Sequence, residues 1–321
     1  MYRIGIDLGG TNIAAGIVND AFEIVCKESI PTGAERPAME IAADMAALCH
    51  KVCEKAGISP SDIASVGIAS PGIANHDEGV IEYCCNIPAF RQFAICDAVK
   101  AGFPVDHVFV ENDANAAAWG EVIAGAAKGT ANSIMITLGT GVGGGIIIDG
   151  KVISGFNYAG AELGHMVISV DGRPCGCGRK GCWEAYSSAT ALIRMTEEKL
   201  AECEAEGRNT AMAADVAAKG KVSGRTAFDC MRAGDPAATE VVDIYLHYLA
   251  QGLSNIINIF QPEVLSIGGG VSGEGQSLIE ALLPEIRREV YGQGIVKSTD
   301  IRIAALKNDA GIIGGAVLGL K

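Results

Sequence analysis

A strand–turn–strand pattern that occurs twice is the feature that most constrains the fold of this chain. The first copy, "IGIDLGGTNIAAGIV", begins at Ile4, and the second, "MITLGTGVGGGIII", begins at Met135, about 130 positions later. Each copy has an apolar run, a turn of small residues that includes Thr, and a second apolar run, which is typical of a β-hairpin. A gene-duplicated pair of α/β domains would contain this repeat, although two similar hairpins also arise by chance.

The remaining periodicity predicts an α/β chain. The first 113 residues have the order βββαβαβ, with strands expected at 2–8, 13–18, 24–30, 63–69 and 105–110 and a helix at 36–56 that Gly57 ends. The rest of the chain predicts helices at 114–127, 189–206, 215–219, 236–260 and 276–290, strands at 134–138, 145–148, 152–153, 263–267 and 300–306, and a final small-residue helix. Asp235 and Pro236 predict the N-cap and first residue of the helix at 236–260.

Length and charge exclude several classes of protein. The 321 residues are enough for two ordinary domains. The net charge of −13 argues against a duplex-DNA binder, which needs a basic face to displace counterions from phosphate. The N-terminus has no pattern of a secretory signal, and the longest apolar stretch, residues 133–148, is broken by glycines and too short to cross a bilayer. We expect a cytoplasmic protein that binds neither nucleic acid nor a membrane.

Most of the eleven cysteines are expected to be reduced and buried, because an odd number scattered through a long chain does not indicate a disulfide framework. Adjacent Cys84 and Cys85 could be sensitive to redox conditions, although nothing in their neighbourhood predicts a lowered thiol pKa. The expected buried thiols are Cys26, Cys49, Cys53, Cys96, Cys203 and Cys230.

Residues 161–184, "AELGHMVISVDGRPCGCGRKGCWE", contain a different arrangement of cysteines. Cys175, Cys177 and Cys182 together with His165 make a Cys₃His set, which is a complete tetrahedral shell for Zn²⁺. Because such a shell has no open position for chemistry, the metal would be structural. The alternative is three buried thiols and a core histidine.

Three glycine turns indicate a phosphate ligand. Residues 139–144 fit the pattern G-x-G-x-x-G, but strand-like residues follow them, whereas the dinucleotide motif needs a helix there. Residues 268–273 also fit, so a Rossmann enzyme is a minor alternative, and a P-loop sequence is absent. Each turn alone could be a tight hairpin. Three turns together could surround a polyphosphate with backbone N–H groups, and Asp7 beside the first turn would then hold Mg²⁺ through water, so the set favours ATP.

The segments "DLGGTN", "ENDANAAA", "LGTGVGGG", "AELGH", "CGCGRKGCWE" and "SIGGGVS", in this order, resemble the ROK (repressor, open reading frame, kinase) family, and most closely its bacterial glucokinases. The resemblance covers nearly the whole chain. It implies a two-domain actin-like, hexokinase-like (ribonuclease H-like) α/β fold with the ligand cleft between the domains, and a homodimer. The small domain would be residues 1–113 plus 305–321, and the large domain, with the zinc loop, residues 114–304.

The same resemblance assigns roles to individual residues. Asp113 is the implied general base; the alternative from the sequence is an N-cap of the following helix. Sugar contacts are implied for Asn112, Glu162, His165 and Glu184, and from the small domain for Ser70-Pro71-Gly72 and Asn86. His165 would use one ring nitrogen for zinc and the other for a sugar hydroxyl. The implied nucleotide-binding residues are Asp7, Gly9, Gly10, Thr11, Asn12, Gly139, Thr140, Gly141, Gly143, Gly268, Gly269 and Gly270.

The implied activity is phosphorylation of the 6-hydroxyl of glucose by ATP. Asn86-Ile87-Pro88-Ala89-Phe90 departs from the spelling common in family glucokinases, so N-acetylmannosamine, allose and fructose stay open as acceptors. A sugar-responsive repressor is the alternative from another class. Such proteins carry a winged helix before the first phosphate turn, and here Asp7 already lies at that turn, so no room for it is expected.

Overall fold

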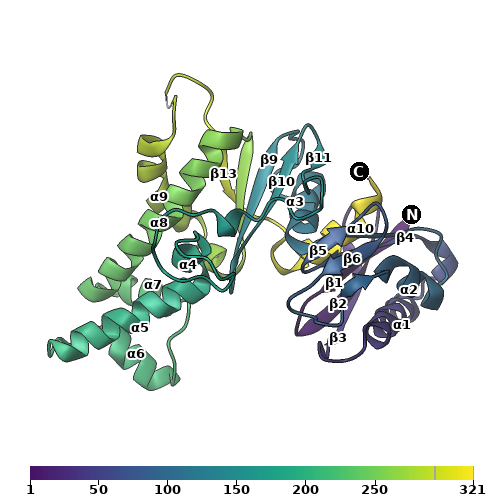
Figure 1. Ribbon diagram of the computed structural model, residues 1–321, viewed down its shortest axis with the longest axis horizontal. Helices are drawn as coiled ribbons and strands as arrows, with labels where there is room; N and C mark the ends of the chain where they lie inside the picture. Colours follow the sequence, from purple (N-terminus) through teal and green to yellow (C-terminus); the bar gives the residue numbers. More distant parts are fainter. Residues whose placement is uncertain (293, 321) are drawn as a thin grey trace. The chain divides into compact units, whose positions relative to one another are not determined.

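Two five-stranded sheets with the same strand order form the framework of residues 1–292 and 294–320, which the computed structural model describes (Figure 1). The first sheet has the order β3 (Ile24–Pro31), β2 (Asn12–Val18), β1 (Tyr2–Leu8), β4 (Ile63–Ser70) and β8 (Val108–Asn112). The second has the order β11 (Lys151–Val152), β10 (Val142–Ile148), β9 (Ser133–Leu138), β12 (Val264–Gly268) and β13 (Asp300–Ile303). When the five strands of each sheet are numbered in chain order, both sheets have the spatial order 3-2-1-4-5. The sequence repeat therefore reflects a repeated topology.

The chain divides into two compact units. One contains residues 1–135, 144–161 and 304–321, and the other contains residues 136–143 and 162–303. The boundary passes through β9 and β10, so both units share strands of the second repeat. The domain boundaries expected from the sequence, with divisions at Asp113 and between residues 304 and 305, stay a prediction.

The first sheet has helices on both faces because its strands alternate. In β1, the apolar side chains of Ile4 and Ile6 join a core with α1 (Ala38–Ala56) and α2 (Ile95–Gly102). Gly5, between them, faces the opposite side, where α10 (Ala310–Ala316) packs. This alternation follows from the period of two in a strand. It explains why glycine stands between the two isoleucines, at the position where α10 comes closest to β1.

The approach of α10 is closer than side chains permit. A Cβ on Gly5 would lie 1.7 Å from the carbonyl oxygen of Ile312, and a Cβ on Gly67 would lie 1.9 Å from that of Gly315. The helix α3 (Asp113–Ala124) also packs closely on α10, since a Cβ on Gly314 would lie 2.1 Å from the carbonyl oxygen of Ala116. Glycines on both sides therefore let backbone pack on backbone.

One local expectation for the first unit needed correction, and one sheet was not expected. The strand expected at 105–110 runs over Val108–Asn112, because parallel pairing with β4, from Val66 with Val108 to Ser70 with Asn112, sets its register. The sequence also gave no sign of a three-stranded sheet, β5 (Ile73–Asn75), β6 (Val80–Tyr83) and β7 (Arg91–Phe93). Strands this short carry too little periodicity to be recognised.

The second unit is mostly helical: α4 (Glu184–Ser187), α5 (Ala189–Ala205), α6 (Ala211–Lys219), α7 (Thr226–Arg232), α8 (Pro236–Phe260) and α9 (Gln276–Glu289). The predicted start of α8 is confirmed, because the Asp235 side chain accepts hydrogen bonds from the N–H groups of Ala237 and Ala238 at 2.8 and 3.3 Å. The sequence did not predict α7. It placed the start of α6 at residue 215, four residues after the observed start at Ala211, which Thr210 caps.

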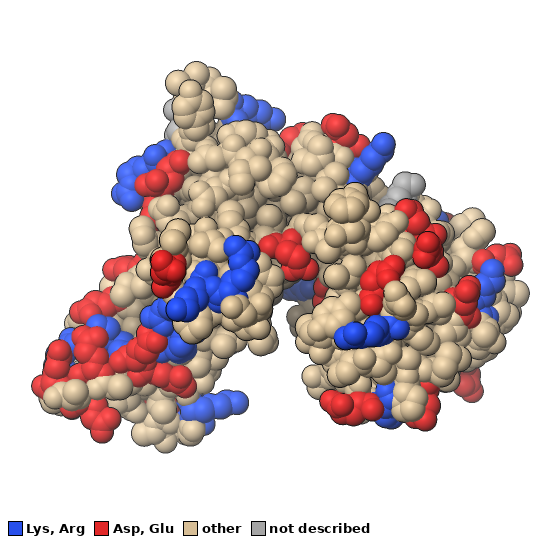
Figure 2. Space-filling view, viewed as in Figure 1, with Lys and Arg blue, Asp and Glu red and all other residues tan. Residues whose placement is uncertain are grey.

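Surface charges of opposite sign lie close together. On the face drawn in Figure 2, Lys and Arg side chains lie beside Asp and Glu side chains. Arg173 donates to both carboxylate oxygens of Glu198 at 2.6 Å, for example. Within the described part of the chain, no helix combines the length and apolar character needed to cross a membrane.

All eleven cysteines are free thiols. Five of the six cysteines expected to be buried are buried: Cys49, Cys53, Cys96, Cys203 and Cys230. Cys26 is half-buried because it lies on β3, where half-buried and exposed side chains alternate.

Replacing Gly5 with alanine is expected to lower the free energy of unfolding by about 1–3 kcal/mol or more, because the methyl group meets backbone that cannot yield cheaply. Gly273→Ala is the matched control, since a Cβ there meets nothing within 4 Å. Urea denaturation of both variants measures the difference. Equal stability of the two variants would contradict the close packing of α10.

Candidate functional site

The corner between β8 and α3 carries three consecutive polar residues, Glu111, Asn112 and Asp113. Asn112 is the N-cap of α3, because its Oδ1 accepts hydrogen bonds from the N–H groups of Ala114 and Asn115 at 3.0 and 3.2 Å. The interpretation of Asp113 as the N-cap is therefore wrong. Asp113 is the first helical residue and is exposed, with its Oδ1 accepting from the N–H of Ala114 at 2.8 Å. Its role as a general base stays a prediction.

Glu111, in contrast, is buried, with 1% of its surface exposed. Its Oε1 accepts hydrogen bonds from the N–H of Asn112 at 3.0 Å and from Nδ2 of Asn115 at 3.2 Å. A buried carboxylate requires donors of this kind, since an unpaired one would be strongly unfavourable. Glu111 thus fixes the backbone at the start of α3 from the inside.

Two residues expected to line the sugar pocket contact each other. Nδ2 of Asn112 donates a hydrogen bond to the carbonyl oxygen of Gly72 at 3.0 Å. Gly72 has a φ of 90°, and a Cβ there would lie 2.2 Å from the carbonyl oxygen of Tyr83, so only glycine fits. Asn86 is exposed on the following loop, and its Cβ lies 3.4 Å from the position of a Cβ on Gly10. The loops with Gly72, Asn86 and the first glycine turn are therefore all parts of one unit.

The first glycine turn is closed by hydrogen bonds and borders a half-buried carboxylate. The N–H of Gly9 donates to the carbonyl oxygen of Asn12 at 2.9 Å, and Oγ1 of Thr32 donates to that of Gly9 at 2.6 Å. Asp7 is the next-to-last residue of β1, and a Cβ on Gly311 would lie 2.4 Å from its Cγ. Burial raises the pKa of Asp7, because desolvation disfavours the charged form. A cation beside this carboxylate would relieve that cost.

The second and third glycine turns lie side by side in the second unit. The second turn, between β9 and β10, is tied to the start of α5, since the N–H of Ala189 donates to the carbonyl oxygen of Gly139 at 2.8 Å and Oγ1 of Thr190 to that of Thr140 at 2.8 Å. Gly269, in the third turn, has a φ of 82°, and a Cβ there would lie 2.5 Å from the carbonyl oxygen of Leu138. The second turn leads into a strand, as the sequence predicted, and the third into the short 3₁₀ helix Gly270–Glu274.

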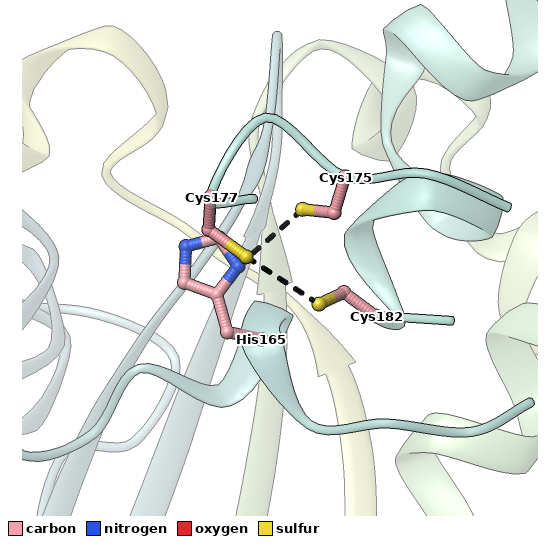
Figure 3. A group of neighbouring side chains, drawn as sticks. All are labelled: His165, Cys175, Cys177 and Cys182. Atoms are coloured by element: carbon pink, nitrogen blue, oxygen red, sulfur yellow. Dashed lines mark hydrogen bonds between the residues drawn. The ribbon is translucent and has the colours of Figure 1, made fainter. Parts of the chain in front are cut away.

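The four residues expected to bind zinc converge. Figure 3 shows the imidazole of His165 and the thiols of Cys175, Cys177 and Cys182 around a common centre, and their ligand atoms all lie within 4.8 Å of one another. Sγ of Cys175 is 3.7 Å from Nδ1 of His165, and Sγ of Cys177 is 3.7 Å from Sγ of Cys182. Tetrahedral ligands at metal–sulfur distances of about 2.3 Å are separated by about 3.8 Å. The donor set and its spacing fit Zn²⁺, and Nδ1 is the ring nitrogen that faces the centre.

Glu184 connects this cluster to the second glycine turn. Its Oε2 accepts a hydrogen bond from the N–H of Val142 at 3.0 Å, and its Oε1 is 3.6 Å from Sγ of Cys175. A Cβ on Gly141 would lie 2.2 Å from Oε2, so the turn needs glycine here to admit the carboxylate. The preceding residue, Trp183, is fully buried and donates from Nε1 to the carbonyl oxygen of Tyr248 on α8 at 3.0 Å. This anchor fixes the start of α4.

Glu162 is exposed, and its carbonyl oxygen accepts a hydrogen bond from the N–H of His165 at 3.0 Å in the 3₁₀ turn Leu163–His165. Glu162, His165 and Glu184 belong to one unit. Their contacts with a sugar stay a prediction.

Sequence reasoning missed His76, which lies against Glu111, and Tyr158, which contacts His76. It also missed Glu121, a fully buried carboxylate on α3 that accepts from the N–H groups of Ala305 and Leu306 at 3.1 and 2.8 Å. The only available signal was an isolated charge in the apolar helix after Asp113, which by itself does not identify a partner.

Comparison with known proteins identifies the family. The ROK family matches residues 3–321. The chain belongs to the ROK family. It is 37% identical to a glucokinase from Halalkalibacterium halodurans over 99% of this chain and 94% of the other.

Two solved structures are similar over nearly their full lengths. One is a ROK family glucokinase from Streptomyces griseus in complex with glucose and AMPPNP, with a TM-score of 0.81, 33% identity and 99% of both chains covered. The other is a ROK hexokinase from Thermus thermophilus, with a TM-score of 0.79, 34% identity and coverage of 99% of this chain and 97% of the other. The chain accordingly has the two-domain actin-like, hexokinase-like fold that its motifs implied.

Replacing Asp7 with asparagine is expected to raise the melting temperature at neutral pH. The raised pKa of Asp7 means that its contribution to stability is complete below the unfolded pKa, about 4, and is lost as the pH rises through the folded pKa. The gain from Asp7→Asn should therefore vanish at acidic pH, and kcat/KM for Mg-ATP should fall. Calorimetry across this pH range, with exposed Asp62→Asn as control, measures the effect. A variant that is less stable than the parent at neutral pH would contradict it.

Proposed function

We propose that this protein is an ATP-dependent hexose kinase that phosphorylates the 6-hydroxyl of glucose. The observation that carries the proposal is the corner between β8 and α3, where a capped helix start presents the exposed carboxylate of Asp113. Its family membership and its similarity to a glucokinase solved with glucose and an ATP analogue support the same activity. The net charge of −13 is unfavourable for a nucleic-acid partner.

In the proposed reaction, Asp113 accepts the proton of the sugar hydroxyl as its oxygen attacks the γ-phosphorus and the bond to the β-phosphate oxygen breaks. Phosphoryl transfer depends mainly on positioning and charge stabilisation, so a fixed carboxylate at the acceptor oxygen is the main chemical contribution of the protein. Asn112, Glu162, His165, Glu184, Gly72 and Asn86 are the proposed sugar-binding residues. The polyol would be recognised through hydroxyls that each donate one directed hydrogen bond.

The proposed nucleotide residues are those of the three glycine turns. Backbone N–H groups in the turns would bind the phosphates, as glycine permits close approach. Asp7 would hold Mg²⁺ through water. The positive charge of the cation would reduce the repulsion between the Asp7 carboxylate and the phosphates. The burial that raises the pKa of Asp7 supports a cation at this position.

We further propose that His165, Cys175, Cys177 and Cys182 bind one structural Zn²⁺. With Nδ1 turned to the metal, Nε2 would be available to a sugar hydroxyl, and the metal would fix the loop that ends at Glu184. We also propose a cytoplasmic homodimer whose chain has a small domain of residues 1–113 plus 305–321 and a large domain of residues 114–304. Another hexose, such as N-acetylmannosamine, allose or fructose, is the alternative acceptor, because one or two hydroxyl contacts decide selectivity.

Asp113→Asn is expected to lower kcat at least about 100-fold and leave the binding of the sugar nearly unchanged, because the amide keeps the shape but accepts no proton. An enzyme-coupled assay of ADP release over a panel of hexoses measures both the acceptor preference and this loss. Asp106→Asn, an exposed carboxylate on the preceding loop, is the control. A variant that retained about a tenth of the parental kcat would refute the role of Asp113, and a parent inactive on every hexose would refute the function.

Metal analysis of the purified protein is expected to find about one zinc per chain, as for closed four-ligand sites. Cys177→Ser should lose the metal and raise KM for the sugar, because His165 and the loop to Glu184 lose their anchor. Cys26→Ser, a half-buried thiol in the other unit, should keep it. Full activity and sugar affinity in a protein without zinc would overturn the proposed site.

A further inference from the structure

A short chain of polar side chains links three segments of the first unit. His76 lies in the turn between β5 and β6, and its Nδ1 is 3.2 Å from Oε2 of the buried Glu111. Its Nε2 is 3.8 Å from Oδ1 of Asp77. On the far side, Oη of Tyr158 donates to Oδ2 of Asp77 at 2.6 Å, and this bond raises the pKa of Tyr158 to about 12.

The contact between His76 and Glu111 favours the ring form that carries a hydrogen on Nδ1. Nδ1 of His76 is itself buried, and its contact with Oε2 is close but outside aligned hydrogen-bond geometry. A hydrogen on Nδ1 is attracted to the carboxylate charge at this distance, whereas a nitrogen lone pair would be repelled, so the contact favours a hydrogen on Nδ1. A carboxylate with only 1% of its surface exposed gains most from this partner, since its charge is poorly solvated.

The other oxygen of Glu111 holds the start of α3. Oε1 accepts from the N–H of Asn112 and from the side chain of Asn115, the residues on either side of Asp113 and Ala114. The orientation of the Glu111 carboxylate therefore sets the backbone from which Asp113 projects. His76 contacts the other oxygen of that carboxylate, Oε2.

Tyr158 packs against the ring of His76. The two rings are 5.1 Å apart at their centroids and nearly perpendicular, at 80°. Tyr158 has a φ of 62°, a conformation that costs energy in a residue with a side chain and needs support from its surroundings. Its contacts with His76 and Asp77 supply this support. Four residues later the chain reaches Glu162.

We propose that His76 is a positioning residue for the phosphoryl-transfer reaction. Its Nδ1–H orients Glu111, which orients the corner that carries Asp113, and Tyr158 holds the imidazole in place through its ring and through Asp77. This inference rests on the proposed role of Asp113. His76 touches neither substrate nor the reacting atoms in this scheme, and acts through Glu111.

The test compares His76→Leu with His76→Asn, because the asparagine amide places an N–H near the position of Nδ1 and leucine does not. His76→Leu should lower kcat about 10- to 100-fold, the range expected for a misplaced catalytic group, with KM for ATP little changed. His76→Asn should restore most of the loss. Tyr158→Phe, which keeps the ring but not the hydrogen bond to Asp77, should lose less than His76→Leu.

A second measurement does not depend on the activity. Hydrogen exchange of the backbone amides of Ala114 and Asn115 should become faster in His76→Leu, while that of α1 stays unchanged. His107→Leu is the matched control, since His107 lines the same cavity as His76 but is exposed and stacks on Phe109. It should leave kcat and exchange as in the parent.

Parental kcat and parental exchange in His76→Leu would overturn the inference. An equal loss of kcat in His76→Leu and His76→Asn would also overturn it, because it would show that the N–H is not what matters. These outcomes are separate from failure of the proposed function, which would appear as an inactive parent while the exchange difference persisted.

Discussion

The packing of α10 on β1 and β4 is the constraint on which the first unit depends. The contact is made by backbone, because Gly5 and Gly67 have no side chain at the points where the carbonyl oxygens of Ile312 and Gly315 approach. It brings the end of the chain back to its beginning, and the same helix packs on α3 through Gly314. The position of α3, and with it the position of Asp113, is therefore set by residues that are distant in sequence and carry no chemistry of their own.

In the second unit, side-chain contacts hold the loop that ends at Glu184 in place. Glu184 accepts a hydrogen bond from the second glycine turn and lies beside the Cys₃His cluster, while the adjacent Trp183 is buried against α8. Gly252 on α8 makes room for this tryptophan, since a Cβ there would lie 2.0 Å from its ring. The zinc proposed at the four converging ligands would fix the same loop, because a closed four-ligand site holds its ligands at set positions.

The sequence predicted what depends on local chemistry. The repeated hairpins, the long helices and the cap of α8 follow from periodicity and from single residues such as Asp235 and Pro236. The Cys₃His cluster was predictable because cysteine spacing is itself informative. Contacts between distant segments were not: His76 and Tyr158 stand 82 positions apart and neither belongs to a motif. Asn112 was assigned a sugar contact and Asp113 an N-cap alternative, and only the backbone dihedrals decide which of two adjacent polar residues caps the helix.

The corner at Glu111, Asn112 and Asp113 gives three adjacent polar residues three different environments. The strand geometry of β8 turns Glu111 inward, the cap position commits the Asn112 side chain to backbone N–H groups, and the first helical residue turns the Asp113 carboxylate outward. A buried carboxylate one residue before the cap is costly unless donors surround it, and those donors belong to Asn112 and Asn115, two residues at the start of the helix. The hydrogen bonds that stabilise the buried Glu111 carboxylate therefore also fix the backbone at the start of α3. An exposed carboxylate on that fixed backbone is the arrangement that a general base requires, because it must be held in place and still reach its substrate.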